Sequence, residues 1–179
     1  MMYCIVLALL EFRLKGWILA KVIVFGNSAS GKSTYAKRLK NEDGLAHLDL
    51  DEIAWLPTSP PTRQTLEVSR KQIMTFVDTH EDWVIEGCYA DLIAMVAPFS
   101  DELIYMDLPV ELCIKNTQAR PWEPHKYESK AAQDANLPML IDWIKQYDKR
   151  TDEFSKQAHC TLFDTYQGKK TRLNANSTR

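Results

Sequence analysis

Eight residues near the start of the chain have the types and spacing needed to bind phosphate groups. Residues Gly26 to Ser33 read GNSASGKS, which fits the Walker A pattern GxxxxGK[ST]. The glycines of that pattern allow a tight turn, so that successive backbone N–H groups surround phosphate oxygens at a helix N-terminus. Lys32 would add positive charge at the β- and γ-phosphates, and the hydroxyl of Ser33 would be a ligand of Mg²⁺.

The residues around this loop decide whether the pattern is meaningful, because GxxxxGK[ST] also occurs in chance glycine turns. A β-branched and aromatic run, Val22 to Phe25, precedes it, and a helical pattern, Lys32 to Lys40, follows it. This strand–loop–helix context favours a nucleotide site. The predicted nucleotide contacts are Gly26, Asn27, Ser28, Ala29, Ser30, Gly31, Lys32, Ser33 and Thr34.

Two carboxylates end a second predicted strand, Leu45 to Asp51. Asp49 and Asp51 are two residues apart, so strand alternation places both on one side. One or two carboxylates suffice for a Mg²⁺ that is bound mainly through phosphates and water, and an acid near the acceptor hydroxyl can orient it. The alternative is that one of the two caps a helix that begins at Glu52.

A third acid ends the next strand, Trp83 to Gly87. Glu86 stands where a Walker B acid would orient Mg²⁺ or its water, and Gly87 lets the backbone approach a substrate closely. The alternative is a solvated carboxylate at a strand end. Ligands of open α/β sheets bind at this end of the strands, which favours the functional interpretation.

Several cations could neutralise phosphoryl charge during transfer. Arg120 ranks first because it begins a proline-rich segment, residues 120 to 127, that we predict to cover the site. Lys126 and Arg150 are further candidates, although most surface cations contribute little. Arg63 and Arg70, on the helix after the acid pair, are candidates for holding an anionic acceptor.

Aromatic and sulfur-containing residues give weaker signals. Trp55, Tyr89 and Trp122 could form the wall of an acceptor pocket or be ordinary half-buried aromatics. His125 is a loop residue rather than a metal ligand, because no second histidine or cysteine has ligand spacing. The four cysteines are far apart, which predicts reduced thiols and neither a disulfide framework nor a zinc site.

Length and charge limit the class of protein. The 179 residues suit one α/β domain, and the 22 Lys and Arg nearly balance the 24 Asp and Glu. Near-neutral charge argues against stable binding to nucleic acid or to an anionic membrane. We therefore expect a cytoplasmic protein with small-molecule ligands; its oligomeric state stays open.

The first ten residues are all apolar, but Glu11, Arg13 and Lys15 interrupt the run before it could span a bilayer. A secretory signal would need positive charge ahead of the apolar run, where this chain has none. We expect residues 1–20 to be an extension of uncertain status and residues 21–179 to form the domain.

The remaining pattern alternates between strands and helices. Strand patterns end near residues 51, 87 and 108, helical patterns cover 62–79, 91–96, 111–119, 136–150 and 151–166, and residues 170–173 could form a fifth edge strand. Such alternation predicts a three-layer α/β fold in which a parallel sheet of about five strands has helices on both faces. The loop, Asp51 and Glu86 would then lie at one edge of the sheet.

These motifs resemble those of P-loop kinases of the adenylate kinase and shikimate kinase type, over about residues 21 to 173. The segments Trp83 to Tyr89 and Arg120 to Trp122 look most like bacterial proteins described as topology modulation proteins or shikimate-kinase-like ATP-binding proteins. The resemblance implies a helical lid at about 120–135 that carries Arg120. It also implies a metal role for the first acid, Asp49, and a role for the second, Asp51, in holding a substrate hydroxyl.

One departure from shikimate kinases is informative. They carry a glycine-rich run after the third strand, where this chain has Cys88-Tyr89-Ala90-Asp91, so shikimate itself is disfavoured as a substrate.

Taken together, the motifs favour an ATP- and Mg²⁺-dependent phosphotransferase with a small-molecule acceptor. Lys32, Asp51 and Arg120 would be its catalytic residues, and Ser33, Asp49 and Glu86 its metal site. The alternative is a regulatory NTPase that acts through a protein or DNA partner. The sequence leaves the acceptor open.

Overall fold

Five parallel strands form the centre of the molecule. The computed structural model describes residues 20–124 and 126–176. The strand order is β2 (Ala46–Asp49), β5 (Trp83–Gly87), β1 (Lys21–Gly26), β6 (Glu102–Met106) and β7 (Lys169–Leu173). All four neighbouring pairs are parallel, and β7 is the edge strand that the sequence suggested at 170–173.

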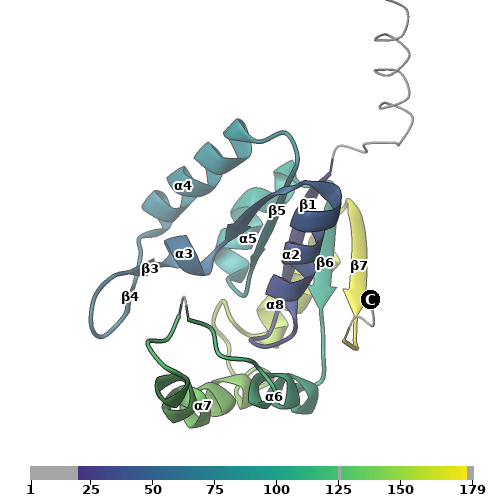
Figure 1. Cartoon of the computed structure of the whole chain (residues 1–179). Helices are drawn as coiled ribbons and strands as arrows, with labels where there is room; N and C mark the ends of the chain where they lie inside the picture. Colours follow the sequence, from purple (N-terminus) through teal and green to yellow (C-terminus); the bar gives the residue numbers. More distant parts are fainter. Residues whose placement is uncertain (1–19, 125, 177–179) are drawn as a thin grey trace, which may run out of the picture.

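Helices cover both faces of this sheet (Figure 1). Along β1, Ile23 and Phe25 belong to one apolar cluster, whereas Val22 and Val24 belong to the other, because successive strand side chains point to opposite faces. The first cluster includes residues of α4 (Leu66–Thr79), α5 (Ala90–Val96) and α8 (Lys156–Thr165). The second includes residues of α2 (Lys32–Asp43), α6 (Val110–Gln118) and α7 (Lys130–Lys145). The predicted three-layer α/β fold is thus confirmed.

The strand order determines where a ligand would bind. After β1 the chain forms β2 and β5 on one side of it, and then β6 and β7 on the other. Such a switch opens a crevice at the carboxyl ends of the central strands. Figure 1 shows α6 and α7 at the end of the sheet to which β6 points.

Several element boundaries between β2 and α4 differ from the sequence-based expectation. Strand β2 ends at Asp49, and Asp51 begins the short helix α3 (Asp51–Ala54). An antiparallel hairpin of β3 (Trp55–Leu56) and β4 (Thr62–Arg63) occupies part of the predicted loop and the start of the predicted helix, so α4 begins only at Leu66, where Thr65 caps it.

Helices α7 and α8 begin elsewhere than predicted because serine caps mark their true starts. The side chain of Ser129 accepts the N–H of Ala132 and starts α7 six residues before the predicted Asn136, with Pro138 inside the helix. The side chain of Ser155 accepts the N–H of Ala158 and starts α8 at Lys156. The 3₁₀ turn η1 (Ala97–Phe99) follows α5.

In residues 20–124 and 126–176, no helix has the length and apolar character that crossing a membrane requires. The predicted extension, apart from Ala20, lies outside the described residues, as does His125.

Candidate active site

The phosphate-binding loop lies between the end of β1 and the start of α2, as predicted. Gly26, Ala29 and Gly31 have positive φ angles of 145°, 59° and 93°. A Cβ at position 26 would lie 2.4 Å from the carbonyl oxygen of Met106 in β6, so only glycine fits there. The loop thus turns tightly against the sheet and leads directly into the N-terminus of α2.

Two distant helices hold this loop in place. The buried Asn27 donates through Nδ2 to the carbonyl oxygen of Ile144 in α7 (3.3 Å), and its Oδ1 accepts the N–H of Ser28 (2.8 Å). In α6, Asn116 Nδ2 donates to the carbonyl oxygen of Ala29 (3.0 Å). Sequence reasoning missed Asn116, since a single asparagine inside a helical pattern gives no signal of its partner.

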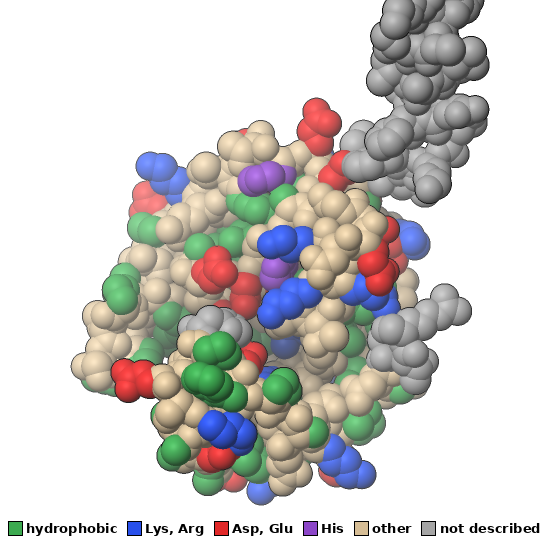
Figure 2. Space-filling model, viewed as in Figure 1, with side chains coloured by type: hydrophobic (Ala, Val, Ile, Leu, Met, Phe, Trp, Pro, Cys, Tyr) green, Lys and Arg blue, Asp and Glu red, His purple; other side chains and the backbone are tan. Residues whose placement is uncertain are grey.

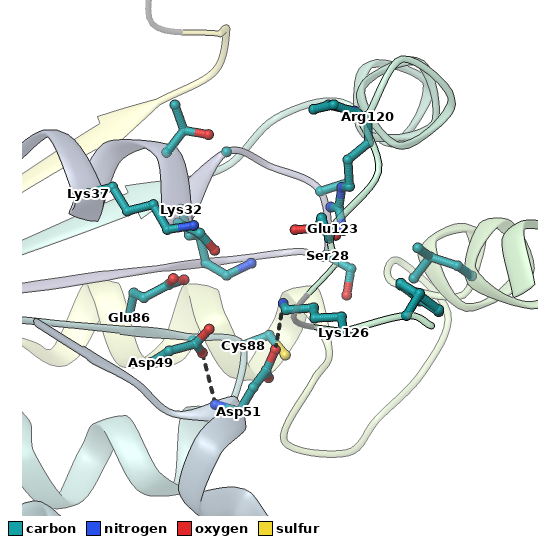
Figure 3. Close-up of a pocket in the computed structure, with 18 of the residues that line it drawn as sticks. Ser28, Lys32, Lys37, Asp49, Asp51, Glu86, Cys88, Arg120, Glu123 and Lys126 are labelled. Atoms are coloured by element: carbon teal, nitrogen blue, oxygen red, sulfur yellow. Dashed lines mark hydrogen bonds and ion pairs between the residues drawn. The ribbon is translucent and has the colours of Figure 1, made fainter. Parts of the chain in front are cut away.

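The loop opens into a cavity of about 520 Å³. Figure 3 shows Lys32, the acids and the cover residues around it, and Figure 2 shows acidic and basic side chains beside a hollow on this face. Most of the predicted site residues line this cavity: Ser28, Ala29, Gly31, Lys32, Ser33, Thr34, Asp49, Asp51, Glu86, Arg120 and Lys126. Gly26, Asn27 and Ser30 do not line it; they are buried and form the turn behind it.

Lys32 is directed along the loop. Its side chain is buried, and Nζ donates to the carbonyl oxygen of Asn27 at 2.8 Å. This bond holds the ammonium group in the concavity of the loop, where a phosphate oxygen could replace the carbonyl.

Asp49 and Glu86 are register partners at the ends of β2 and β5. Burial, together with the charges of Glu86 and Asp51, raises the pKa of Asp49 to about 6. Burial would also raise the pKa of Glu86, but the nearby His47, Lys32 and Ser33 outweigh it and lower that pKa. Glu86 is therefore the acid of the pair that ionises more readily, whereas burial and the neighbouring carboxylates disfavour ionisation of Asp49.

Both carboxylates could support a cation next to the phosphate-binding loop. Glu86 Oε1 is buried without a hydrogen-bond partner, and His47 Nε2, which also lacks one, is 3.6 Å away. The described residues contain no cluster of three His, Cys, Asp or Glu side chains able to hold a metal alone. The residues thus fit Mg²⁺ held mainly through phosphates, water and Ser33, with acids in support.

Asp51 lies further from the loop and is fixed by a chain of hydrogen bonds. Trp55 Nε1 donates to the hydroxyl of Tyr89 (2.6 Å), which donates to Asp51 Oδ1 (2.6 Å). Burial and the Asp51 charge raise the pKa of Tyr89, so this hydroxyl keeps its proton. Asp51 Oδ2 lies 3.7 Å from Lys126 Nζ, as Figure 3 shows. The N–H of Asp51 also donates to Asp49 Oδ1 (2.9 Å), but the cap residue of α3 is Leu50, which makes no side-chain capping bond, and the helix begins at Asp51 instead of Glu52.

Residues 119–124 and 126–129 contain neither helix nor strand and cover the cavity, in agreement with the predicted irregular segment. Arg120 NH1 pairs with Glu123 Oε2 at 3.0 Å. From α7, Gln133 accepts the N–H of Glu123 (2.9 Å) and donates to the carbonyl oxygen of Pro121 (3.1 Å). The start of α7 therefore supports the cover, and the lid at about 120–135 stays a prediction.

A buried polar relay, which sequence reasoning also missed, supports the turn after β5. Tyr105, Tyr147 and His159 are linked by two contacts of 2.8 Å, and His159 Nε2 lies 3.0 Å from the carbonyl oxygen of Cys88. Because a carbonyl only accepts, Nε2 carries the proton and Nδ1 accepts the hydroxyl of Tyr147. Burial lowers the pKa of His159 to about 4, so the ring is neutral.

The other predicted cations do not line this cavity. Arg63 pairs with Asp91 Oδ2 (3.0 Å), and its guanidinium carbon lies 4.7 Å from the ring centre of Tyr89. Arg150 pairs with Asp152 and stacks on Trp143. Arg70 is an exposed residue of α4.

A second cavity, of about 780 Å³, also borders the loop. Residues of α2 line it, together with the segment from Asn116 to Pro121 and Asn176 near the end of the chain. Six residues line both cavities: Ala29, Gly31, Thr34, Lys37, Arg120 and Pro121.

Comparison with known proteins gives matches only among solved structures. No family model matches the chain, and no curated protein matches its sequence. One similar structure is a sugar kinase from Janibacter sp., with 16% identity over 86% of this chain and 83% of the other and a TM-score of 0.46. A second is the deoxyadenosine kinase of M. mycoides with bound dATP, with 12% identity over 86% of this chain and 90% of the other and a TM-score of 0.44. A third is the shikimate kinase of Acinetobacter baumannii with shikimate, with 15% identity over 89% of this chain and 86% of the other and a TM-score of 0.47.

Proposed function

We propose that this chain is an ATP-dependent phosphotransferase that moves the γ-phosphoryl group to a hydroxyl of a small molecule. The observation that carries the proposal is that Lys32, Asp51 and Arg120, from three separate segments, line one cavity at the phosphate-binding loop. Lys32 would bind the phosphates of the donor, and Asp51 would bind the acceptor hydroxyl. Arg120 would neutralise the charge of the phosphoryl group during transfer.

The donor half of the reaction rests on the loop. Its backbone N–H groups and Lys32 would hold the β- and γ-phosphates, and the second cavity would take the base and ribose. Bound Mg²⁺, next to Ser33 with Asp49 and Glu86 in support, would neutralise phosphate charge. Arg120 would exchange Glu123 for an oxygen of the transferring group.

The acceptor half rests on Asp51. With Oδ1 fixed by Tyr89, Oδ2 would accept the hydrogen bond of the acceptor hydroxyl. The hydroxyl oxygen forms a bond to the γ-phosphorus, the bond from that phosphorus to the β–γ bridging oxygen breaks, ADP leaves and the hydroxyl proton passes to Asp51. Burial raises the pKa of the Cys88 thiol to about 12, so this thiol stays protonated and is a poor nucleophile.

The proposal is tested by comparing Lys32→Ala with Lys40→Ala, a matched change at an exposed position of the same helix. Transfer of radiolabelled γ-phosphoryl to a panel of nucleosides, sugars and hydroxy acids is measured, and circular dichroism checks the fold. Lys32→Ala should lower transfer by at least about 100-fold with an unchanged fold, whereas Lys40→Ala should match the wild type. Undiminished transfer by Lys32→Ala would refute the proposal.

The same assay addresses the regulatory NTPase. Phosphate release to water that needs no acceptor and rises with a protein partner would favour that alternative. ADP release that depends on an acceptor would favour the phosphotransferase.

A further inference from the structure

The acceptor end of the cavity, around Asp51, is rich in negative charge. Asp49 and Asp51 lie together there, joined by the bond from the Asp51 N–H to Asp49 Oδ1. Glu86, the register partner of Asp49, and Glu123 line the same cavity, so four carboxylates border it and repel one another. One more anion would add to this repulsion.

The cations near this end are already paired with carboxylates. Lys126 pairs with Asp51 at 3.7 Å, and Arg120 pairs with Glu123 at 3.0 Å. Arg63, the sequence-based candidate for binding an anionic acceptor, pairs with Asp91 behind the ring of Tyr89. Of the cations described at the cavity, Lys32 and Lys37 lie on α2, on the donor side.

Lys126 cannot serve an anionic acceptor without a cost. If Lys126 bound a carboxylate or phosphate of the acceptor, Asp51 would lose its ion-pair partner. Asp51 would then also be repelled by the negative charge of the acceptor. An uncharged hydroxyl compound avoids this conflict. Its hydroxyl donates to Asp51 Oδ2 while the ion pair stays in place, and the rings of Trp122 and Tyr127, which also line the cavity, offer apolar faces to a sugar or base.

We infer that the phosphoryl acceptor is an uncharged hydroxyl compound of nucleoside or monosaccharide size, and not a carboxylate or a phosphate monoester. The inference rests on the proposed function, because it names the acceptor class of the same site. The cavity of about 520 Å³ must also hold the terminal phosphates of the donor, which limits the acceptor to this size.

Matched pairs of acceptors test the inference. Each pair differs in charge: a nucleoside against its 5′-monophosphate, and a monosaccharide against the corresponding sugar acid. kcat/KM for radiolabelled transfer from ATP is measured for each compound. We expect the uncharged member of at least one pair to be phosphorylated with a kcat/KM at least about tenfold above that of its anionic partner.

The variant Lys126→Met adds a second arm. Because Asp51 already neutralises Lys126, the preference for uncharged acceptors should persist in this variant. A selective loss of the anionic acceptor in Lys126→Met would identify Lys126 as an anion-binding group and overturn the inference.

The two proposals fail in different ways. A kcat/KM equal or higher for the anionic members would overturn the acceptor class while phosphoryl transfer stands. Release of phosphate to water with no transfer to any acceptor would overturn the proposed function itself.

Discussion

Replacing His159 by glutamine tests whether the buried relay beneath the site is neutral and structural. Glutamine has a similar reach and can donate to the Cys88 carbonyl and accept from Tyr147, but it does not titrate. Burial lowers the pKa of His159 from 6.5 to about 4. As the pH falls the unfolded chain therefore binds this proton first, so the stabilisation is fully present above about pH 6.5 and is lost toward pH 4.

The magnitude follows from the two pKa values. At pH 5 the pH lies about 1.5 units below the pKa of this histidine in the unfolded chain, so protonation stabilises the unfolded state. The folded ring is still mostly neutral at this pH and gains almost nothing. At 1.36 kcal/mol per unit, the wild type should lose about 2 kcal/mol of unfolding free energy between pH 7 and pH 5 through His159 alone. The glutamine variant should not lose this part.

Urea unfolding at pH 7, 6 and 5 measures the difference between the two proteins. The comparison with the variant is needed because Asp49 affects the stability of both proteins in the opposite direction. Its raised pKa contributes stability that is present below about pH 3.8 and is lost as the pH rises through about 6. A His80→Gln control, at an exposed histidine, should keep the wild-type pH dependence. An equal loss of stability in His159→Gln and in the wild type would refute a neutral, buried His159.

Three further substitutions test the site. Glu86→Gln removes the buried charge, and the Mg²⁺ concentration for half-maximal transfer should rise about 10- to 100-fold; an unchanged Mg²⁺ titration would contradict a supporting role. Tyr89→Phe frees Asp51 Oδ1, so kcat should fall about tenfold with an unchanged KM for ATP, and an unaltered kcat would argue against positioning of Asp51. Gly26→Ala drives a Cβ against the Met106 carbonyl, so titration with a fluorescent ATP analogue should show no binding, and wild-type affinity would mean that the turn adapts.

The sequence was most informative where function depends on neighbours in the chain. The loop from Gly26 to Ser33 is a local pattern, and Glu86 follows from the end of a local strand, so both could be placed before any tertiary contact was known. The strand alternation that grouped Asp49 with Asp51 was less accurate. The structure ends β2 at Asp49 and starts a helix at Asp51, because Asp49 itself accepts the first N–H of that helix.

The residues that sequence reasoning missed act across long separations. Asn116 bonds to Ala29, 87 residues away, and His159 bonds to Cys88, 71 residues away. Whether an arginine serves a substrate or another part of the fold also depends on such contacts. Arg63 stands in a plausible position for an anionic acceptor, yet Asp91, 28 residues later, pairs with it, and no periodicity reports that pairing.

Three cations at this cavity share a property that constrains how a nucleotide would bind. Lys32 bonds to the Asn27 carbonyl, Arg120 to Glu123 and Lys126 to Asp51, so these cations all have protein partners. Phosphate binding must exchange those bonds for new ones, which returns little net energy per cation. The backbone N–H groups of the loop can bind phosphate without breaking an ion pair. The rigidity of the loop, fixed by Asn27 and Asn116, should therefore determine donor affinity, while the paired cations determine which acceptor charge is tolerated.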